Sequence, residues 1–177
     1  MPTCAELKPY KEASVDFADT LMLKASLARR RQDTGAWLTS YQDLDEVLVW
    51  KLRGQYRRLV RRGGEDSDAR IRQVTSLALS EANAPDSVRF ALRQLLLLKW
   101  VGMGVATSIL GLCLPHLYAP IDFRSWRAAF GEEKKRFGFG DYERYLAWIR
   151  NCARELGWLP QEVDLALWAY DMANQRS

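Results

Sequence analysis

The chain has 177 residues, of which 48% are hydrophobic and 27% are charged, as in ordinary soluble globular proteins. This composition excludes collagen-like and disordered chains, and the length is sufficient for one domain without stabilising disulfides. Lysine and arginine exceed aspartate and glutamate, which gives a formal net charge of +4, and the clustering of these charges matters more than their sum.

Apolar residues recur at spacings of three and four along almost the whole chain, and no stretch alternates at a spacing of two. The sequence therefore predicts an all-α protein of about eight to ten helices, whose ends are marked by capping residues, prolines and glycines. In chain order, helices are expected at about 10–28 and 41–52, in a short basic segment after Gly54 up to 62, at 67–83 and 88–98, between Gly104 and Pro115, and at 122–130, 141–156 and 160–173.

The cysteines and the histidine limit the metal chemistry that is possible. Cys4, Cys113 and Cys152 lie far apart and form no C-x-x-C pair. We therefore expect neither a disulfide framework nor a four-cysteine metal site, and we expect a reducing compartment. The one histidine, His116, follows Pro115 and is expected to be a solvated loop residue rather than a metal ligand.

The sequence shows no sign of export or of a membrane span. Its first residues lack a basic segment followed by an apolar core, and the most apolar stretch, residues 95–117, is interrupted by lysine, glycine and proline. We expect a cytoplasmic monomer, associated with the nucleoid if the protein is bacterial.

Residues 95–130 form the most informative stretch. They read as a helix, a tight turn with Gly102 and Gly104, a second helix, an extended segment and Asp122 at the start of a third helix. Two glycines let the backbone turn sharply, while Met103 between them fills the space between the helices. This pattern predicts a helix-hairpin-helix, whose free amides can hold a DNA phosphate without reading sequence.

The run GMGVATS, an apolar helix, a proline-bounded loop and the run YAPIDFRSWR together resemble the helix-hairpin-helix DNA glycosylases, the group that contains endonuclease III and the adenine and alkylated-base glycosylases. The resemblance is specific over residues 95–130. It implies a single domain of two helical lobes, about 38–114 and 1–37 with 115–177, with the hairpin and the aspartate on the rim of the cleft between them. It also implies double-stranded DNA as the partner.

The resemblance makes Asp122 the catalytic carboxylate. Cleavage of an N-glycosidic bond builds positive charge on the sugar, which an ionised carboxylate stabilises, and the same group can orient or deprotonate an attacking water. Alternatively, Asp122 caps the helix that begins at Phe123, and both roles can coexist. Two other classes of function stay open: a non-catalytic DNA-binding module, and a structural or regulatory helical protein.

Family members that also cleave the strand carry a lysine two residues after the second hairpin glycine, and Ala106 occupies that position here. The resemblance therefore implies a monofunctional, water-using glycosylase, without an iron–sulfur cluster or other cofactor. Two other amines stay open as alternatives. Lys99 precedes the turn, where phosphate contact or solvation is expected, and Lys51 ends the helix that matches the base-pocket side of the family.

The residues expected to touch DNA fall into two sets, because base excision needs a held backbone, a wedge and flat surfaces for the extruded base. The backbone-binding set is Gly102, Met103, Gly104, Val105, Lys99 and Arg124. The base-pocket or wedge set is Trp50, Lys51, Arg53, Gln55 and Trp100. The excised base stays open, as does the choice between repair and defence against foreign modified DNA.

Basic residues gather in three groups, within residues 29–31, 51–62 and 124–136. Such runs are usually solvated helix ends. The second and third groups flank the expected pocket wall and Asp122, so a basic track across one cleft follows if the lobes fold as in the family.

Overall fold

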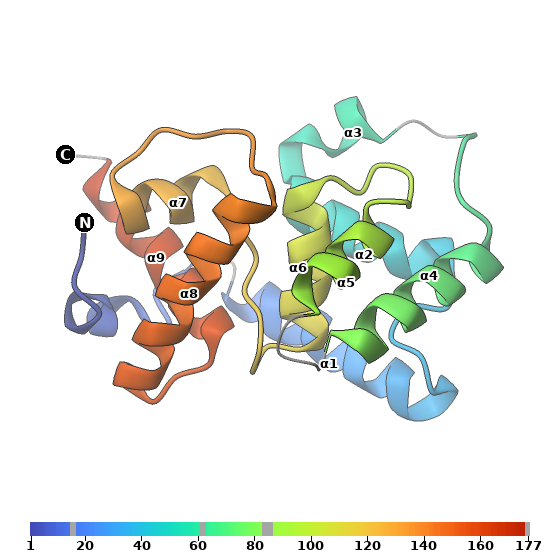
Figure 1. Cartoon of the computed structure of the whole chain (residues 1–177), viewed down its shortest axis with the longest axis horizontal. Coiled ribbons are helices and arrows are strands. Elements are labelled where there is room, and N and C mark those ends of the chain that lie inside the picture. The colour runs from blue at the N-terminus through green and yellow to red at the C-terminus, as the bar shows by residue number, and fades with distance from the viewer. Residues whose placement is uncertain (15–16, 61–62, 83–86, 176–177) are drawn as a thin grey trace.

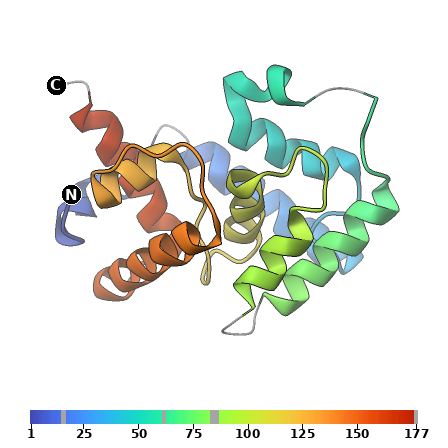
Figure 2. The ribbon, with the colours of Figure 1, turned by 45° about the horizontal axis from the view of Figure 1, so that its top comes forward.

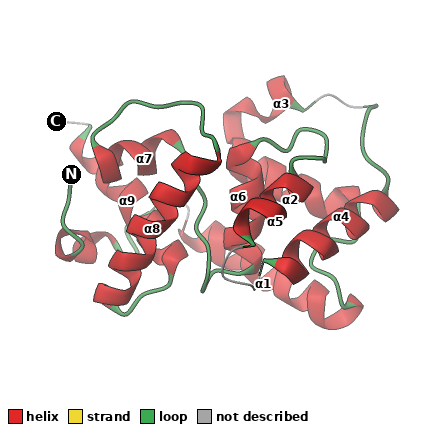
Figure 3. Ribbon diagram, viewed as in Figure 1, coloured by secondary structure: helices red, strands yellow, loops and turns green. Residues whose placement is uncertain are grey.

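The computed structural model describes residues 1–14, 17–60, 63–82 and 87–175, and within them the chain is helical and contains no strand (Figure 3). The prediction of an all-α protein is therefore confirmed. The elements are η1 (Ala5–Tyr10), α1 (Phe17–Thr34), α2 (Tyr41–Leu52), η2 (Arg53–Gln55), α3 (Tyr56–Leu59), α4 (Asp68–Glu81), α5 (Val88–Leu95), α6 (Met103–Cys113), α7 (Phe123–Phe130), α8 (Phe139–Leu156) and α9 (Pro160–Asn174). No helix in this part of the chain is both long and apolar enough to cross a bilayer.

The observed helix ends agree with the predicted ones where a capping residue fixes the end. Ser40 caps α2 and Asp122 caps α7, each through its side chain. Gly131 and Gly157 end α7 and α8 in the left-handed conformation, at φ 67° and 68°.

The amino-terminal helix differs from its predicted range of 10–28. The structure has a short 3-10 helix, η1, followed by α1, which continues through the arginine run at 29–31 instead of ending there. Arginine is a strong helix former, so α1 continues through the run and ends at Thr34. The next residue, Gly35, has a φ of 75°, which suits a residue without a side chain.

A disulfide joins Cys4 to Cys152, across 148 positions of sequence. The expectation that the cysteines form no disulfide is therefore wrong for this pair, and the inference of a reducing compartment loses its basis. The two meet because η1 and α8 both pack against α9, which brings their Cα atoms within 5.2 Å. Cys113 stays free inside α6, where burial raises the pKa of its thiol.

The helices pack in two groups, which lie side by side in Figures 1 and 2. In one group η1, α7 and α8 pack against α9; in the other α1 and α2 pack against α6, and α4 packs against α5. The segment 1–37 is thus divided, since η1 contacts α9 whereas α1 contacts α6 and α2. One hydrophobic core extends through both groups and includes Leu48, Ile109, Tyr145 and Val163.

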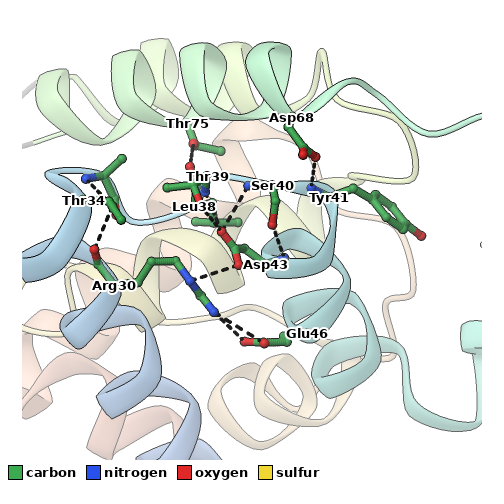
Figure 4. Close-up of polar contacts among 11 residues, drawn as sticks. Arg30, Thr34, Leu38, Thr39, Ser40, Tyr41, Asp43, Glu46, Asp68 and Thr75 are labelled. Carbon is green, nitrogen blue, oxygen red and sulfur yellow. Dashed lines mark hydrogen bonds and ion pairs between the residues drawn. The ribbon is translucent and has the colours of Figure 1, made fainter.

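A buried carboxylate, Asp43, fixes the amino-terminal end of α2 (Figure 4). Its Oδ2 accepts hydrogen bonds from the backbone N–H groups of Thr39 at 2.6 Å and Ser40 at 3.1 Å. Its Oδ1 lies 3.0 Å from Nε of Arg30, which comes from α1. These contacts hold α2 against α1 and so position Lys51, which lies about two turns further along α2.

The segment between α6 and α7 runs between the two groups of helices (Figure 1). Gly111 allows this segment to lie close to α6, because a Cβ at position 111 would lie only 2.7 Å from Cδ and 3.0 Å from N of Pro120. Oγ1 of Thr107, also on α6, accepts a hydrogen bond from the backbone N–H of Ile121 at 3.1 Å. The segment is thus fixed against α6, and the residue that follows Ile121 is Asp122.

Candidate active site

Asp122 occupies the N-cap position of α7. Its Oδ1 accepts hydrogen bonds from the backbone N–H groups of Arg124 at 2.9 Å and Ser125 at 3.0 Å. The capping role expected from the sequence is therefore confirmed. The cap uses one oxygen of the carboxylate and leaves Oδ2 for another partner.

That partner is Lys51 at the end of α2. Its Nζ lies 3.3 Å from Oδ2 of Asp122, and the two side chains are 12% and 27% exposed. The stem of Lys51 passes over the first turn of α6, because its Cε lies 3.6 Å from the place that a Cβ on Gly104 would occupy. Three helices, α2, α6 and α7, therefore meet at this ion pair.

The Asp122 carboxyl is held in its charged form. Burial by itself would raise its pKa, but the ammonium of Lys51 and the N–H groups of Ser125 and Arg124 outweigh that effect, and the pKa lies below its usual range. An ionised oxygen that solvent can still reach is able to stabilise a nearby cation or to accept a proton.

A second carboxylate, Asp164 of α9, is connected to this pair and is only 7% exposed. Its Oδ1 accepts hydrogen bonds from Oγ of Ser125 and Oη of Tyr145, both at 2.6 Å. Burial and the negative charge of Asp122 raise the pKa of Asp164 to about 6.

Asp164, Ser125 and Tyr145 are absent from the residues predicted from the sequence. A signal for Asp164 was present, since Asp164 and Asp171 stand seven positions apart and so share one face of a helix whose central part, from 163 to 170, is otherwise apolar. The structure buries both side chains. Serine and tyrosine at buried positions carry no comparable signal, because their hydroxyl groups are common in protein cores.

The first turn of α6 lies beside the ion pair and is open at its end. Gly102 is the N-cap, with an extended ψ of −180°, and no side chain caps the helix. Gly102 is exposed, Met103 and Gly104 are partly buried, and Val105 is 3% exposed. The amides of an uncapped helix start are suited to an anion such as phosphate, so this arrangement is compatible with the predicted backbone contacts.

The two basic residues of the predicted backbone-binding set differ in their surroundings. Lys99 is exposed, and its backbone N–H donates to Asp66 at 2.7 Å. Arg124 is engaged within the protein, since its guanidinium lies 3.3 Å from Asp171 and over the rings of Phe123 and Trp168. A phosphate bound to Arg124 would compete with the carboxylate of Asp171 for the guanidinium group.

Trp50, from the predicted pocket set, lines a shallow groove of about 450 Å³ between α1 and α2. Its indole N–H donates to Oγ1 of Thr20 at 3.3 Å. The groove is also lined by Asp19, Asp45 and Glu46, whose charges would repel a phosphate. Asp122 is not part of this lining, so a role of Trp50 in holding a base stays a prediction.

Of the other pocket residues, Arg53 and Gln55 lie together on η2, whereas Trp100 lies in the segment before α6. Trp100 adopts a left-handed φ of 62°, unusual for a residue with a side chain, and packs edge-to-face on Tyr41 with 6.0 Å between ring centroids. Arg53 and Gln55 are exposed on η2. Of the predicted pocket set, Lys51 is the residue for which the structure gives a contact with Asp122.

The basic groups are only partly exposed where the structure describes them. Arg57 and Arg58 of α3 face solvent, as do Lys135 and Arg136, whereas Arg127 is bound to the buried Asp171. Arg61 and Arg62, which belong to the second predicted group, lie outside the described residues. A continuous basic track therefore stays a prediction.

Within the described residues, no group of three or more histidine, cysteine, aspartate or glutamate side chains is arranged to hold a metal ion. Comparisons with known proteins add no relative: no family model matches the chain, and neither a curated protein nor a solved structure matches it significantly. Any function must therefore be argued from the residues themselves.

Proposed function

We propose that this protein is a DNA N-glycosylase that flips and excises an altered base, with Asp122 as the carboxylate that acts on the sugar. The observation that carries the proposal is the placement of Asp122 at the start of α7, ionised, beside the uncapped first turn of α6. The resemblance of residues 95–130 to the helix-hairpin-helix glycosylases supports the same function. The proposal includes a cleft between two lobes, with duplex DNA bound across it.

In the proposed reaction the base leaves with the electron pair of the N-glycosidic bond, and C1′ of the sugar becomes cationic. Oδ2 of Asp122 stabilises that charge, and a water adds to C1′ while its proton passes to the carboxylate. The amides of Met103, Gly104 and Val105 hold a phosphate of the same strand. The ammonium of Lys51 competes with the sugar for Oδ2, so Lys51 has to turn away from Asp122 when the nucleotide enters.

A second candidate is a glycosylase that also cleaves the strand, and the 3.3 Å contact between Lys51 and Asp122 favours it. Ala106, where the family carries its lysine, is fully buried and supplies no amine. In this route the ammonium of Lys51 gives one proton to the departing base, and neutral Nζ adds to C1′. A second proton passes from Nζ through Asp122 to O4′, and the sugar ring opens to a protonated imine. Loss of a C2′ proton then expels the 3′ phosphate.

The decisive experiment is incubation of the protein with duplexes that carry single altered bases, followed by heat and alkali to reveal abasic sites. Wild type should release a base, and Asp122→Asn should not. Asp141→Asn is the matched control, because Asp141 also stabilises a helix start and pairs with a lysine, Lys134, at 2.6 Å. Excision by Asp122→Asn at the wild-type rate would reduce Asp122 to a helix cap.

Borohydride trapping separates the two chemical routes. Intact abasic strands without a covalent adduct identify the water-using enzyme. An adduct that is lost in Lys51→Ala but kept in Lys99→Ala identifies Lys51 as a nucleophile. Duplex binding without base release from any substrate would leave a non-catalytic DNA-binding protein and overturn the proposed function.

A further inference from the structure

Asp164 is a buried carboxylate that neither proposed route uses. Fully burying a carboxylate in an α-helical core is unfavourable unless its charge is matched by donors, and aspartate is rare at such positions. Here two hydroxyl groups at 2.6 Å supply the donors, one from α7 and one from α8. The arrangement is thus a built polar connection between three helices.

Ser125 is the link between Asp164 and Asp122. Its backbone N–H donates to Oδ1 of Asp122 at 3.0 Å, while its Oγ donates to Oδ1 of Asp164 at 2.6 Å. Ser125 is fully buried, so water does not replace either bond. A change in how Asp164 holds the serine hydroxyl therefore moves the amide that holds Asp122.

We propose that ionised Asp164 is a positioning residue for Asp122, which acts through Ser125 to hold the first turn of α7 so that Oδ2 of Asp122 stays directed toward Lys51 and the substrate. This inference rests on the proposed function of Asp122. Asp164 touches neither the substrate nor the reacting atoms in this scheme.

The charge of Asp164 gives this connection a dependence on pH. The charged and titratable groups that face Asp164 are Asp122, Lys51, Tyr142 and Tyr145. Hydrogen bonds to an ionised carboxylate are shorter and stronger than bonds to a neutral carboxylic acid, so protonation of Asp164 weakens its hold on Ser125. Since the pKa of Asp164 is raised to about 6, this loss falls in the mildly acidic range.

The first measurement needs no activity. Carboxyl NMR of the folded protein follows the titration of Asp164 in wild type, Asp122→Asn and Ser125→Ala. The midpoint should fall in Asp122→Asn, because a nearby negative charge is gone, and rise in Ser125→Ala, because a donor to the ionised form is gone. Thr75→Val, which removes a buried hydroxyl group on the remote helix α4, should leave the midpoint unchanged.

The second measurement is the pH profile of base release. In wild type kcat should fall as the pH drops through about 6, with KM little changed. Asp164→Asn should lower kcat at neutral pH by about 10- to 100-fold, the scale of a slightly misplaced reacting group, and should lack the acidic limb. Ser125→Ala should likewise lower kcat at neutral pH and lack that limb, because it removes the hydroxyl group through which Asp164 acts.

The results separate the two proposals. An Asp164 midpoint that is the same in wild type and Asp122→Asn, or an acidic limb that persists in Asp164→Asn, overturns the positioning role. A folded wild type that releases no base from any duplex overturns the proposed function instead, and the positioning role with it, while the titrations still decide whether Asp164 and Asp122 are coupled.

Discussion

Lys51 and Asp122 form an ion pair, with Nζ and Oδ2 3.3 Å apart, although 71 positions separate them in the sequence. Lys51 comes from the end of α2 and Asp122 from the N-cap of α7, and both side chains retain some exposure. The pair places an amine beside the proposed catalytic carboxylate without any basic residue in the hairpin itself. It therefore helps to keep Asp122 ionised, and it supplies the amine that the second proposed route needs.

Asp122→Asn should abolish base release with a small effect on folding. Asparagine caps helices about as well as aspartate, but Lys51 loses its partner, so we expect a loss of about 1 kcal/mol in the free energy of unfolding. Base release should fall by about 10²–10³ or more, the effect of a lost electrostatic group. Duplex affinity should hold or rise, because a negative charge near phosphates is removed. Denaturant unfolding, binding and excision measured on one preparation check the pattern.

Lys51→Met should raise the pKa of Asp122 toward or above its usual range, because burial then acts without the opposing ammonium. In wild type the lowered pKa contributes stability above about pH 4 that is lost as the pH falls through the folded-state value. The stability difference between wild type and Lys51→Met should thus be largest at neutral pH and shrink in acid. Urea unfolding at pH 7 and pH 3 tests this; an equal difference at both would contradict it. Lys99→Met, an exposed lysine, is the control.

Gly111→Ala should destabilise the protein by about 1–3 kcal/mol, the usual cost of forcing extra atoms into a packed core. A Cβ at this position meets the ring and backbone of Pro120, which cannot move without shifting the segment that leads to Asp122. Gly140→Ala is the matched control, since Gly140 is also helical but has open space around it. It should leave stability unchanged or slightly raised. Thermal unfolding of both variants gives the comparison, and equal melting temperatures would refute the close approach.

Asp164 should give the free energy of unfolding an unusual dependence on pH. Its raised pKa means that the folded state binds this proton more tightly than the unfolded chain, so its contribution weakens as the pH rises from about 4 to about 6. Asp164→Asn removes that contribution. Subtracting its unfolding free energy from that of wild type at each pH should give a difference that falls with rising pH over this range; a flat difference would show that Asp164 titrates normally.

Duplex binding should depend steeply on salt. If about five phosphates are neutralised, the logarithm of affinity should fall against the logarithm of salt concentration with a slope of roughly −4 to −5. Lys99→Ala should reduce the slope by about 1, because it removes one phosphate contact without changing any base contact. Affinity that is constant between low and physiological salt would be incompatible with the predicted hairpin contacts.

The helical class and many helix ends could be predicted from the sequence, because periodicity and capping are local properties. Ser40, Asp122 and Gly131 act within one or two turns of their own position, so their residue types are sufficient to place α2 and α7. The start of α6 near Gly102 could be predicted for the same reason. The first helix was predicted to end in the arginine run, but α1 continues to Thr34 and Gly35 follows it with a φ of 75°.

The meeting of distant residues depends on how the helices are arranged in space. The bond between Cys4 and Cys152, the contact of Lys51 with Asp122 and the link from Asp122 through Ser125 to Asp164 all depend on how helices pack. Packing is set by the fit of many side chains along whole helix faces, for example the approach of Pro120 to Gly111, and no local pattern encodes it. Charge states follow the same rule, since burial and neighbours, rather than residue type, lower the pKa of Asp122 and raise that of Asp164.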